Sequence, residues 1–416
     1  MKRIIFLNRF FFPDHSATSQ LLSDLAFSLV GRAAEVHVVT SQQLYEDPRA
    51  RLPATETIRG VKVHRIATSQ FGRSALPGRA VDYISFYGSM WRALQTIVRK
   101  DDILIAKTDP PLLSVLAMKV AKKRGAYLIN WLQDIYPEVA AELGVLFLSG
   151  PFSQILTPFR DSSLKFAHAN VVVGQRMGER VISLGVSPER LHVIHNWIDD
   201  KDITPVCQSD NPLRLSWGLE NKFVIGYCGN LGRAHEFDTV LEASEQLKNN
   251  SNILFLFVGG GHKFEELSQR VRKLGLESLF KFLPHINPFQ SPDAFRYLLS
   301  VPDVHWISLK PTLEGLIVPS KFYGTAAAGR PTIALTATDG EIAQLVRRYE
   351  CGVVVEPGNS NLLADVILKL SNDMARVRDM GARARKMLET DFTRIQALEK
   401  WWSILQKASS AKLASH

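Results

Sequence analysis

Short apolar runs that alternate with helical segments recur along the whole chain, and this alternation constrains the fold more than any other feature. In the first half the runs lie at residues 4–7, 35–40, 103–108, 127–133, 170–174 and 191–196, with a hairpin expected around 61–66. In the second half they lie at residues 223–229, 253–261, 279–286, 303–309, 331–337 and 352–357. Apolar strands separated by helices indicate parallel sheets that are covered on both faces. We therefore expect an α/β protein built from doubly wound sheets.

The length of the chain predicts two such domains. Its 416 residues are more than one hydrophobic core of ordinary size accommodates. We assign residues 1–199 to an N-terminal Rossmann-like domain and residues 219–390 to a C-terminal one. Residues 200–218 are polar, contain proline and lack periodicity, which is typical of a linker. Residues 391–416 predict an amphipathic C-terminal helix that packs back toward the N-terminal domain.

Composition narrows the class of protein. Hydrophobic residues make up 46% and charged residues 22% of the chain, as in soluble globular proteins. The basic N-terminal residues precede an apolar run that is too short for a signal peptide, and no run approaches the roughly 20 apolar residues that span a bilayer. We expect a cytoplasmic protein that is soluble or peripheral on the inner face of the membrane. The three cysteines lie far apart, so we expect thiols in a reducing compartment, with no disulfide and no zinc site.

The net charge of +9 is concentrated in the first half, where residues 1–199 carry 24 Lys and Arg against 17 Asp and Glu. Residues 59–100 hold eight basic residues and one acid, Asp82, interleaved with aromatic side chains. Such a stretch suits an anionic membrane surface, an acidic acceptor or nucleic acid, and a solvated helix face over core aromatics gives the same pattern. Because the chain contains no nucleic-acid-binding motif, we expect no nucleic acid among its partners.

Glycine-rich loops follow two strands of the second half. Gly229 and Gly232 let the backbone approach a phosphate, and Arg233 could balance its charge. Three successive glycines centred on Gly260 repeat the arrangement after the next strand. The helix N-terminus that follows such a loop suits a diphosphate, although a tight strand-to-helix turn uses the same glycines.

Residues 309–346 combine several chemically useful side chains. Glu314 supplies a carboxylate, Pro319 fixes the start of a helix, and Ser320 supplies a hydroxyl. Lys321 then falls in the first helical turn, where a cation opposes the helix dipole unless it meets an anion. Lys321 is therefore a candidate phosphate ligand, and a lysine that extends to water is the alternative.

The first half offers candidates for the acceptor side. His15, in the loop after the first strand, could orient a phosphate or an acceptor hydroxyl, or it could simply be solvated. Asp134 and Glu138 follow the strand at 127–133, at the sheet edge where ligands bind in α/β folds. We expect Asp134 to polarise the acceptor hydroxyl, with capping of a helix ahead of Pro137 as the alternative.

Three segments of the second half carry a family resemblance. Residues 328–333, AGRPTI, resemble the segment A-x-G-x-P-V/I; residues 340–342 resemble G-x-P-E-I; and residues 351–359 resemble N-G-L-L-V-x-P-G-D. These are segments of glycosyltransferase family 4, the retaining GT-B enzymes, in which two Rossmann-like domains face a central cleft. In the first half, residues 134–138, DIYPE, resemble the D-x-W-P-E of a bacterial branch that makes surface polysaccharides and glycolipids.

The resemblance implies a retaining glycosyltransferase that moves a sugar from a nucleotide-diphosphate sugar to a sugar or lipid-linked acceptor. A UDP-sugar is favoured as donor, with a GDP-sugar as the alternative. Glu341 is implied as a donor contact, Glu314 would position sugar hydroxyls, and Arg233 and Lys321 would meet the diphosphate. No cofactor and no metal are expected, because the one Asp-x-Asp, at residues 200–202, lies in the expected linker.

The chain also departs from the family pattern. Gly324 stands where the family has its second glutamate, so a carboxylate that would hold the ribose is missing. Asn230 and His235 stand where the family often has the arginine and lysine that bind the diphosphate, and Asn230 is still expected there. These departures leave two other functions open: a nucleotide-sugar 2-epimerase of the same fold, and a non-catalytic donor-binding or scaffold homologue, which Gly324 favours.

Overall fold

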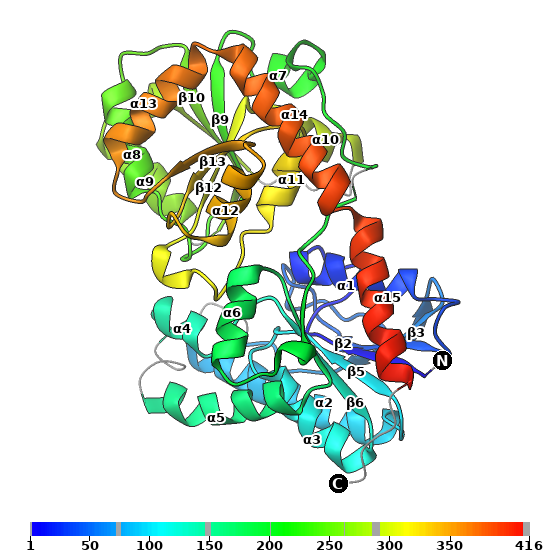
Figure 1. The fold of residues 1–416 in the computed structure, drawn as a ribbon. Coiled ribbons are helices and arrows are strands. Elements are labelled where there is room, and N and C mark those ends of the chain that lie inside the picture. Colours follow the sequence, from blue (N-terminus) through cyan, green and yellow to red (C-terminus); the bar gives the residue numbers. More distant parts are fainter. Residues whose placement is uncertain are drawn as a thin grey trace. The chain divides into compact units, whose positions relative to one another are not determined.

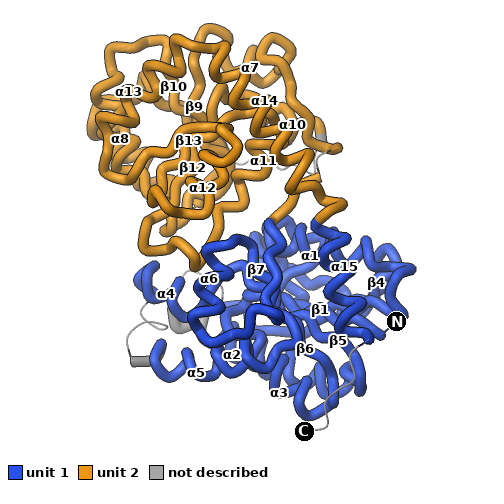
Figure 2. The backbone as a smooth tube through the Cα atoms, viewed as in Figure 1, with its two compact units in different colours: residues 1–195, 397–416 blue, residues 196–396 orange. Residues whose placement is uncertain are grey.

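A computed structural model describes residues 2–71, 76–145, 151–199, 201–261, 263–284 and 292–410. The chain divides into two compact units, unit 1 with residues 1–195 and 397–416 and unit 2 with residues 196–396 (Figure 2). Both contain a predominantly parallel sheet with helices on its faces (Figure 1). The expected α/β class with two Rossmann-like domains is confirmed.

Unit 1 is built on an eight-stranded sheet with the order β3-β4-β2-β1-β5-β6-β7-β8. The strands are β1 (Ile4–Leu7), β2 (Val36–Ser41), β3 (Thr55–Ile58), β4 (Val61–Ile66), β5 (Ile103–Ala106), β6 (Tyr127–Leu132), β7 (Ala169–Val172) and β8 (Leu191–Val193). Edge strand β3 pairs antiparallel with β4 in the expected hairpin, and the other pairs are parallel. Strands β1, β2, β5, β6 and β7 are buried along their whole length, which explains why apolar residues predominate in them.

The helices of unit 1 are α1 (Ala17–Ser28), α2 (Leu76–Ile97), α3 (Leu113–Arg124), α4 (Glu138–Glu142), α5 (Pro151–Phe166), α6 (Gln175–Ser183) and η2 (Pro188–Arg190). The C-terminal helix α15 (Arg394–Ser410) joins them from Ala397 onward. Its fully buried Trp401 packs on Trp131 of β6, with ring centroids 4.7 Å apart. This aromatic contact attaches α15 to the sheet of unit 1.

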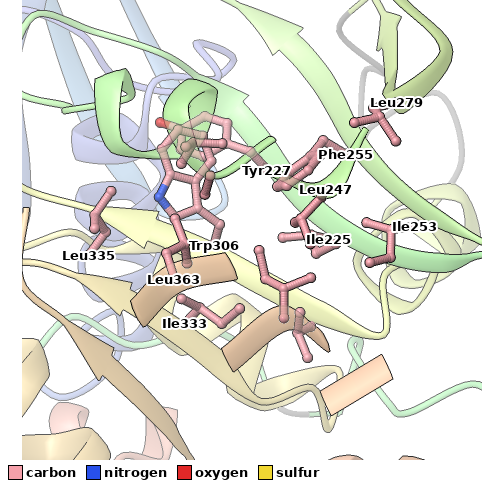
Figure 3. Close-up of a cluster of buried hydrophobic side chains, with 14 of the residues drawn as sticks. Ile225, Tyr227, Leu247, Ile253, Phe255, Leu279, Trp306, Ile333, Leu335 and Leu363 are labelled. Carbon is pink, nitrogen blue, oxygen red and sulfur yellow. The ribbon is translucent and has the colours of Figure 1, made fainter. Parts of the chain in front are cut away.

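Unit 2 contains a six-stranded, all-parallel sheet with the order β11-β10-β9-β12-β13-β14. Its strands are β9 (Phe223–Asn230), β10 (Ile253–Gly260), β11 (Phe280–Leu283), β12 (Val304–Ser308), β13 (Thr332–Leu335) and β14 (Gly352–Val355). Its helices are η3 (Gln208–Asp210), α7 (Pro212–Ser216), α8 (Asp238–Leu247), α9 (Phe264–Lys273), η4 (Glu277–Leu279), α10 (Pro292–Ser300), η5 (Pro311–Leu313), α11 (Lys321–Ala327), α12 (Glu341–Arg348), α13 (Ser360–Ser371) and α14 (Met374–Asp391). Figure 3 shows the main core of this unit, in which Tyr227, Phe255, Trp306 and Leu363 meet over the sheet.

Residues 200–218, expected as a linker, fold as part of unit 2 from Lys201 onward. Asn211 caps α7 by accepting a hydrogen bond from the Leu213 N–H at 3.1 Å. Arg214 of α7 is buried and forms a 3.1 Å ion pair with buried Asp303. The prolines and missing period of this stretch therefore accompany a short capped helix, which a hydrophobic pattern does not reveal.

No helix in the described ranges is long and apolar enough to cross a membrane.

Candidate functional site

The strand order of unit 2 identifies where a ligand binds. The first strand, β9, lies between β10 and β12, so the chain reverses direction across the sheet between β9 and β12. In open α/β sheets this switch point opens a crevice beyond the carboxyl ends of the strands. The loops after β9, β10 and β12 meet there, and they contain most of the donor residues expected from the sequence.

The glycines in these loops have two different roles. A Cβ on Gly259 would overlap the carbonyl of Gly229, and a Cβ on Gly261 would lie 2.7 Å from the carbonyl oxygen of Leu231. These glycines allow the two loops to pack, and the Leu231 N–H donates to the Gly260 carbonyl at 2.7 Å. At Gly260, by contrast, no described atom would lie within 4 Å of an added Cβ. Gly260 therefore leaves room for a ligand beside the backbone.

Lys321 crosses directly over the end of β9. A Cβ on Gly229, whose φ is +119°, would lie 2.7 Å from Cε of Lys321. The Lys321 ammonium donates to the Asn230 carbonyl at 3.3 Å and lies 5.3 Å from the Tyr227 ring centroid. Burial lowers the pKa of Lys321 to about 8, so the group is still mostly charged at pH 7. The structure thus brings Gly229, Asn230 and Lys321 together, with the exposed Ser320 next to them at the N-cap of α11.

His235 anchors the same loop and does not supply a charge. Its Nδ1 lies 2.8 Å from the Ser308 carbonyl of β12, and because a carbonyl only accepts, this nitrogen carries the proton. Burial lowers the pKa of His235 to about 3, with the nearby Lys321 acting in the same direction. The imidazole is therefore neutral at pH 7. Positive charge at this loop comes from the exposed Arg233 within it and from Lys321 of α11, which reaches the Asn230 carbonyl.

Glu314 and Glu341 lie together at the start of α12. The hydroxyl of Thr336 donates to Oε1 of Glu314, and the backbone N–H of Glu341 donates to Oε2 at 3.2 Å. Gly340 permits this approach, because a Cβ there would overlap the carboxylate. Burial raises the pKa of Glu314 above its ordinary value. Each carboxylate oxygen still has a second lone pair, so Glu314 can also accept a hydrogen bond from a hydroxyl of a ligand.

The position of the missing glutamate is apolar in this chain. A Cβ on Gly324 would meet the side chains of Ile198 and Leu299, each at 3.5 Å. Gly324 itself is buried in α11. A carboxylate at this position would therefore enter apolar surroundings, which agrees with its absence from the sequence.

In unit 1 the switch point lies between β1 and β5, and the loops after β1, β5 and β6 meet at its edge. Asp134, after β6, accepts a hydrogen bond from the Thr108 hydroxyl at 3.3 Å. Burial raises the pKa of Asp134 to about 6, and the Thr108 bond opposes the increase. The N-cap of helix α4 is Pro137, so Asp134 does not cap this helix, and the alternative role for Asp134 is wrong. His15 is exposed in the loop after β1.

Glu138 is held by an arginine of α5. Two nitrogens of Arg160 donate to its two carboxylate oxygens at 2.8 and 2.9 Å. This bidentate pair joins α4 to α5. The acceptor contact expected of Glu138 would have to form in addition to this ion pair.

Two side chains at these sheet edges were not expected from the sequence. Thr336, which binds Glu314, and Lys107, which follows β5 and is buried, were not singled out. Lys107 follows an apolar strand directly, at the position where ligand-binding residues of parallel sheets occur, and that position was the available signal. No described group of three or more His, Cys, Asp and Glu could hold a metal ion, and Asp200 of the Asp-x-Asp lies outside the described residues.

Two family models match the chain. The model described as "Glycosyl transferases group 1" matches residues 212–387, and the one described as "Glycosyl transferase 4-like domain" matches residues 18–197. The chain is 26% identical over 308 residues to the probable glycosyltransferase WbjE of Pseudomonas aeruginosa, covering 74% of this chain and 75% of the relative. It is 29% identical over 245 residues to the putative colanic acid biosynthesis glycosyl transferase WcaI of Escherichia coli, covering 57% and 58% of the two chains.

Solved structures share the fold at low sequence identity. Anabaena Alr3699/HepE, solved in complex with UDP, superposes with a TM-score of 0.72 at 18% identity, covering 98% of this chain and all of that one. Sucrose-phosphate synthase from Thermosynechococcus elongatus gives a TM-score of 0.77 at 14% identity, covering 99% of this chain and 100% of that chain. WaaG, a glycosyltransferase of lipopolysaccharide biosynthesis, gives 0.63 at 14% identity, with 98% of each chain covered.

Proposed function

This chain belongs to the GT-B glycosyltransferases of family 4 that act in polysaccharide biosynthesis, and we propose that it transfers a sugar from UDP-sugar to a lipid-linked acceptor with retention of configuration. The observation that carries the proposal is the arrangement at the carboxyl ends of β9 and β10. There the open backbone at Gly260 lies against the loop that carries Arg233, because the Leu231 N–H of that loop donates to the Gly260 carbonyl. Lys321, at the start of α11, reaches the same loop at the Asn230 carbonyl. Two cations beside accessible backbone N–H groups suit the two phosphates of a nucleotide-sugar.

The proposed reaction exchanges one bond at the sugar carbon for another. The bond between the anomeric carbon and the diphosphate oxygen breaks, and a bond from the acceptor oxygen to that carbon forms. Lys321 and Arg233 stabilise the negative charge that develops on the departing diphosphate. A remaining lone pair of Glu314 accepts a hydrogen bond from a hydroxyl of the donor sugar. The acceptor proton passes to the leaving phosphate or to Asp134, which we propose polarises the acceptor hydroxyl.

The donor base and the absence of a metal are also proposals. A solved fold relative binds UDP and UDP-glucose, which supports a UDP-sugar over a GDP-sugar. We propose that no divalent metal takes part, because the cations Lys321 and Arg233 supply the positive charge that a metal would otherwise bring to the diphosphate. His235, being neutral, would accept a hydrogen bond from the ligand through Nε2 and would not pair with a phosphate.

The test is a calorimetric titration of the full chain with UDP, GDP, ADP and their sugar conjugates in the presence of EDTA. UDP should bind, and Lys321→Met should weaken its affinity at least tenfold. The matched control is Lys273→Met, an exposed lysine at the end of α9, which should leave the affinity unchanged. NMR of the transfer product then reports the anomeric configuration, and an inverted product would contradict retention.

One observation favours a second function, that of a donor-binding homologue without catalysis. Gly324 removes a family carboxylate, and its apolar surroundings leave no obvious substitute. Binding of UDP without any transfer to a panel of lipid-linked and sugar acceptors would support this function. Epimerised donor recovered in the absence of any acceptor would instead support the 2-epimerase.

We further propose that unit 1 attaches peripherally to the inner, anionic face of the membrane through helices α2, α3 and α5. The helix α3 contacts both of the others (Figure 1). It exposes Lys119, Lys122 and Lys123, while Ile84 of α2 is 71% exposed and Phe159 of α5 is 50% exposed. Exposed lysines and exposed apolar side chains on contacting helices suit anionic headgroups over an acyl layer.

Sedimentation with liposomes tests this attachment. Binding should increase with the fraction of anionic lipid, decrease with salt, and weaken strongly in the variant Lys119→Glu/Lys123→Glu. The control variant Lys248→Glu/Lys273→Glu changes the net charge equally on exposed lysines of unit 2. An equal loss of liposome binding in both variants would show that only net charge matters. Binding that does not depend on the fraction of anionic lipid or on salt would refute the attachment.

A further inference from the structure

Arg9 lies at the ligand-binding edge of unit 1, in the loop after β1. Its backbone N–H donates to the carbonyl of Asp109, after β5, at 2.8 Å, and its carbonyl accepts from the Ser41 N–H, at the end of β2, at 2.9 Å. The hydroxyl of Thr40 donates to the same carbonyl at 2.9 Å. Because β1 lies between β2 and β5, these bonds hold Arg9 at the switch point of the sheet.

The guanidinium of Arg9 is buried against aromatic rings. Its Cζ lies 5.1 Å from the centroid of the Tyr83 ring of α2 and 5.3 Å from that of Phe10. Arg9 is only 6% exposed, and its Nε is buried without a hydrogen-bond partner. Within the described part of the chain, no residue accepts a hydrogen bond from the guanidinium or forms an ion pair with it. Its N–H donors therefore lack an acceptor in the protein.

Two acids of the neighbouring segments are engaged elsewhere. Asp82 of α2 accepts a hydrogen bond from the Ser69 hydroxyl at 2.6 Å. Asp14, in the same loop as Arg9, accepts one from the backbone N–H of Tyr45. Neither carboxylate neutralises the guanidinium by an ion pair, so the positive charge at this edge is left for another group.

The loop that carries Arg9 is held in place before any ligand binds. Asn8 is fully buried, and its Nδ2 donates to the Phe10 carbonyl at 2.7 Å. This bond adds to those that Arg9 forms with β2 and with the loop after β5. A ligand that binds here would lose little affinity to ordering of the loop.

Packing alone does not explain an arginine at this position. Cation–π contacts recover part of the desolvation cost of a guanidinium, but a methionine would fill the same space without that cost. A buried charged group without a hydrogen-bond partner calls for a physical explanation. A guanidinium presents its donors in a planar fork that matches two oxygens of one anion. The arrangement therefore suits an anionic ligand with paired oxygens.

We propose that Arg9 binds a phosphoryl group of the acceptor. This inference rests on the proposed function, in which the acceptor is lipid-linked and its hydroxyl meets Asp134. Arg9 and Asp134 belong to the same edge, because Asp109, which is bonded to Arg9, follows Thr108, whose hydroxyl donates to Asp134 at 3.3 Å. A phosphoryl group between lipid and sugar is thus held at Arg9, and the sugar extends toward Asp134.

The experiment is a calorimetric titration of the full chain in saturating UDP, which occupies the proposed donor site. The probes are farnesyl diphosphate, farnesol and inorganic phosphate. Farnesyl diphosphate should bind the wild type, and Arg9→Met should weaken this binding by about tenfold or more. Arg9→Lys should have an intermediate affinity, because an ammonium supplies the charge without the planar fork. The matched control is Arg348→Met, which removes an exposed guanidinium 5.2 Å from the Tyr349 ring centroid and should leave the affinity unchanged.

Thermal unfolding separates ligand binding from a structural role of Arg9. Methionine keeps an unbranched side chain against the two rings and removes an unpaired charge, so Tm of Arg9→Met should equal or exceed that of the wild type. Farnesyl diphosphate should raise Tm of the wild type more than that of Arg9→Met. A lower Tm in Arg9→Met together with an unchanged affinity would show a structural arginine and overturn the proposal.

The other probes identify the source of the phosphoryl group. Farnesol that binds as tightly as farnesyl diphosphate would show that the lipid alone is recognised, and this result would overturn the proposal. Inorganic phosphate that binds as tightly as farnesyl diphosphate, with the same loss in Arg9→Met, would show a site for free phosphate and overturn the assignment to the acceptor.

UDP binding decides the proposed function separately. If UDP binds and Arg9→Met binds farnesyl diphosphate as the wild type does, the phosphoryl site at Arg9 is wrong and the donor site stands. If UDP does not bind, the proposed function fails. The comparison of wild type and Arg9→Met without UDP then still decides whether Arg9 holds a phosphoryl group.

Discussion

Replacing Glu314 tests whether its carboxylate holds the start of α12, as the structure indicates. The variant Glu314→Ala removes both hydrogen bonds, one from the Thr336 hydroxyl and one from the Glu341 N–H at 3.2 Å. The variant Glu314→Gln keeps one acceptor oxygen and replaces the other with an amide that can donate to the Thr336 hydroxyl, so it loses the charge and one acceptor. The two variants should therefore differ in stability.

The expected magnitude follows from these contacts. A hydrogen bond from a backbone N–H to a carboxylate contributes about 1.5–3 kcal/mol, and a negative charge at a helix N-terminus contributes about 0.3–1 kcal/mol. Glu314 is half-buried, so water replaces part of what is lost. We expect Glu314→Ala to cost about 2 kcal/mol and Glu314→Gln less than about 1 kcal/mol. A cost of about 2 kcal/mol corresponds to roughly 30-fold faster local opening.

Hydrogen–deuterium exchange of the peptides that cover residues 337–348 measures this opening directly, and calorimetry gives the accompanying Tm. In Glu314→Ala the first amides of α12 should exchange about 30-fold faster, and Tm should fall by about 4–8 °C. The matched control is Glu265→Ala, an exposed carboxylate in the first turn of α9, for which we expect a change within about 0.5 kcal/mol. Wild-type exchange and Tm in Glu314→Ala would refute the assignment.

Further variants test the donor site and the core of unit 2. A diphosphate binds the ammonium form of Lys321, and burial lowers the pKa of this group to about 8. The affinity for UDP, measured by calorimetry, should therefore decrease between pH 7 and pH 9. The same pH dependence in Lys321→Met would contradict this prediction. The variant Gly229→Ala adds a Cβ only 2.7 Å from Cε of Lys321 and strains a backbone whose φ is +119°. It should therefore displace the Lys321 side chain and weaken the affinity for UDP at least tenfold, and an unchanged affinity would contradict the close approach. Asp303→Ala leaves the buried Arg214 without its partner and should cost about 3–5 kcal/mol by urea unfolding, whereas a cost under about 1 kcal/mol would show that the pair is not buried in solution.

Local patterns were sufficient for the architecture. The apolar runs at 223–229 and 253–261 became β9 and β10 nearly residue for residue, because a strand buried on both faces has to be apolar throughout. The hairpin around 61–66 was equally readable. The structure of residues 200–218 could not be predicted from a local pattern, because α7 is one short turn whose stability comes from an asparagine cap and a buried ion pair.

The sequence predicted which residues form the candidate site, but it did not predict which residues they contact. Glycines, Lys321 and Glu314 were expected from their places after strands and from a family resemblance. Their partners could not be expected, because Lys321 lies on Gly229, and Glu314 lies against Gly340, through loops that are distant in the sequence. The neutral state of His235 likewise follows from its bond to Ser308, which belongs to another strand.

The sequence by itself determined the parallel sheets, the division into two units and the family, because strand burial, helix periodicity and short motifs are properties of neighbouring residues. Only the tertiary structure decided which charges are buried and what they meet. Lys107 lies on Trp131, and Trp131 lies on Trp401 of the last helix, so three segments far apart in the chain define one environment. Burial and electric fields are sums over everything nearby in space, and such sums exist only once the chain has folded.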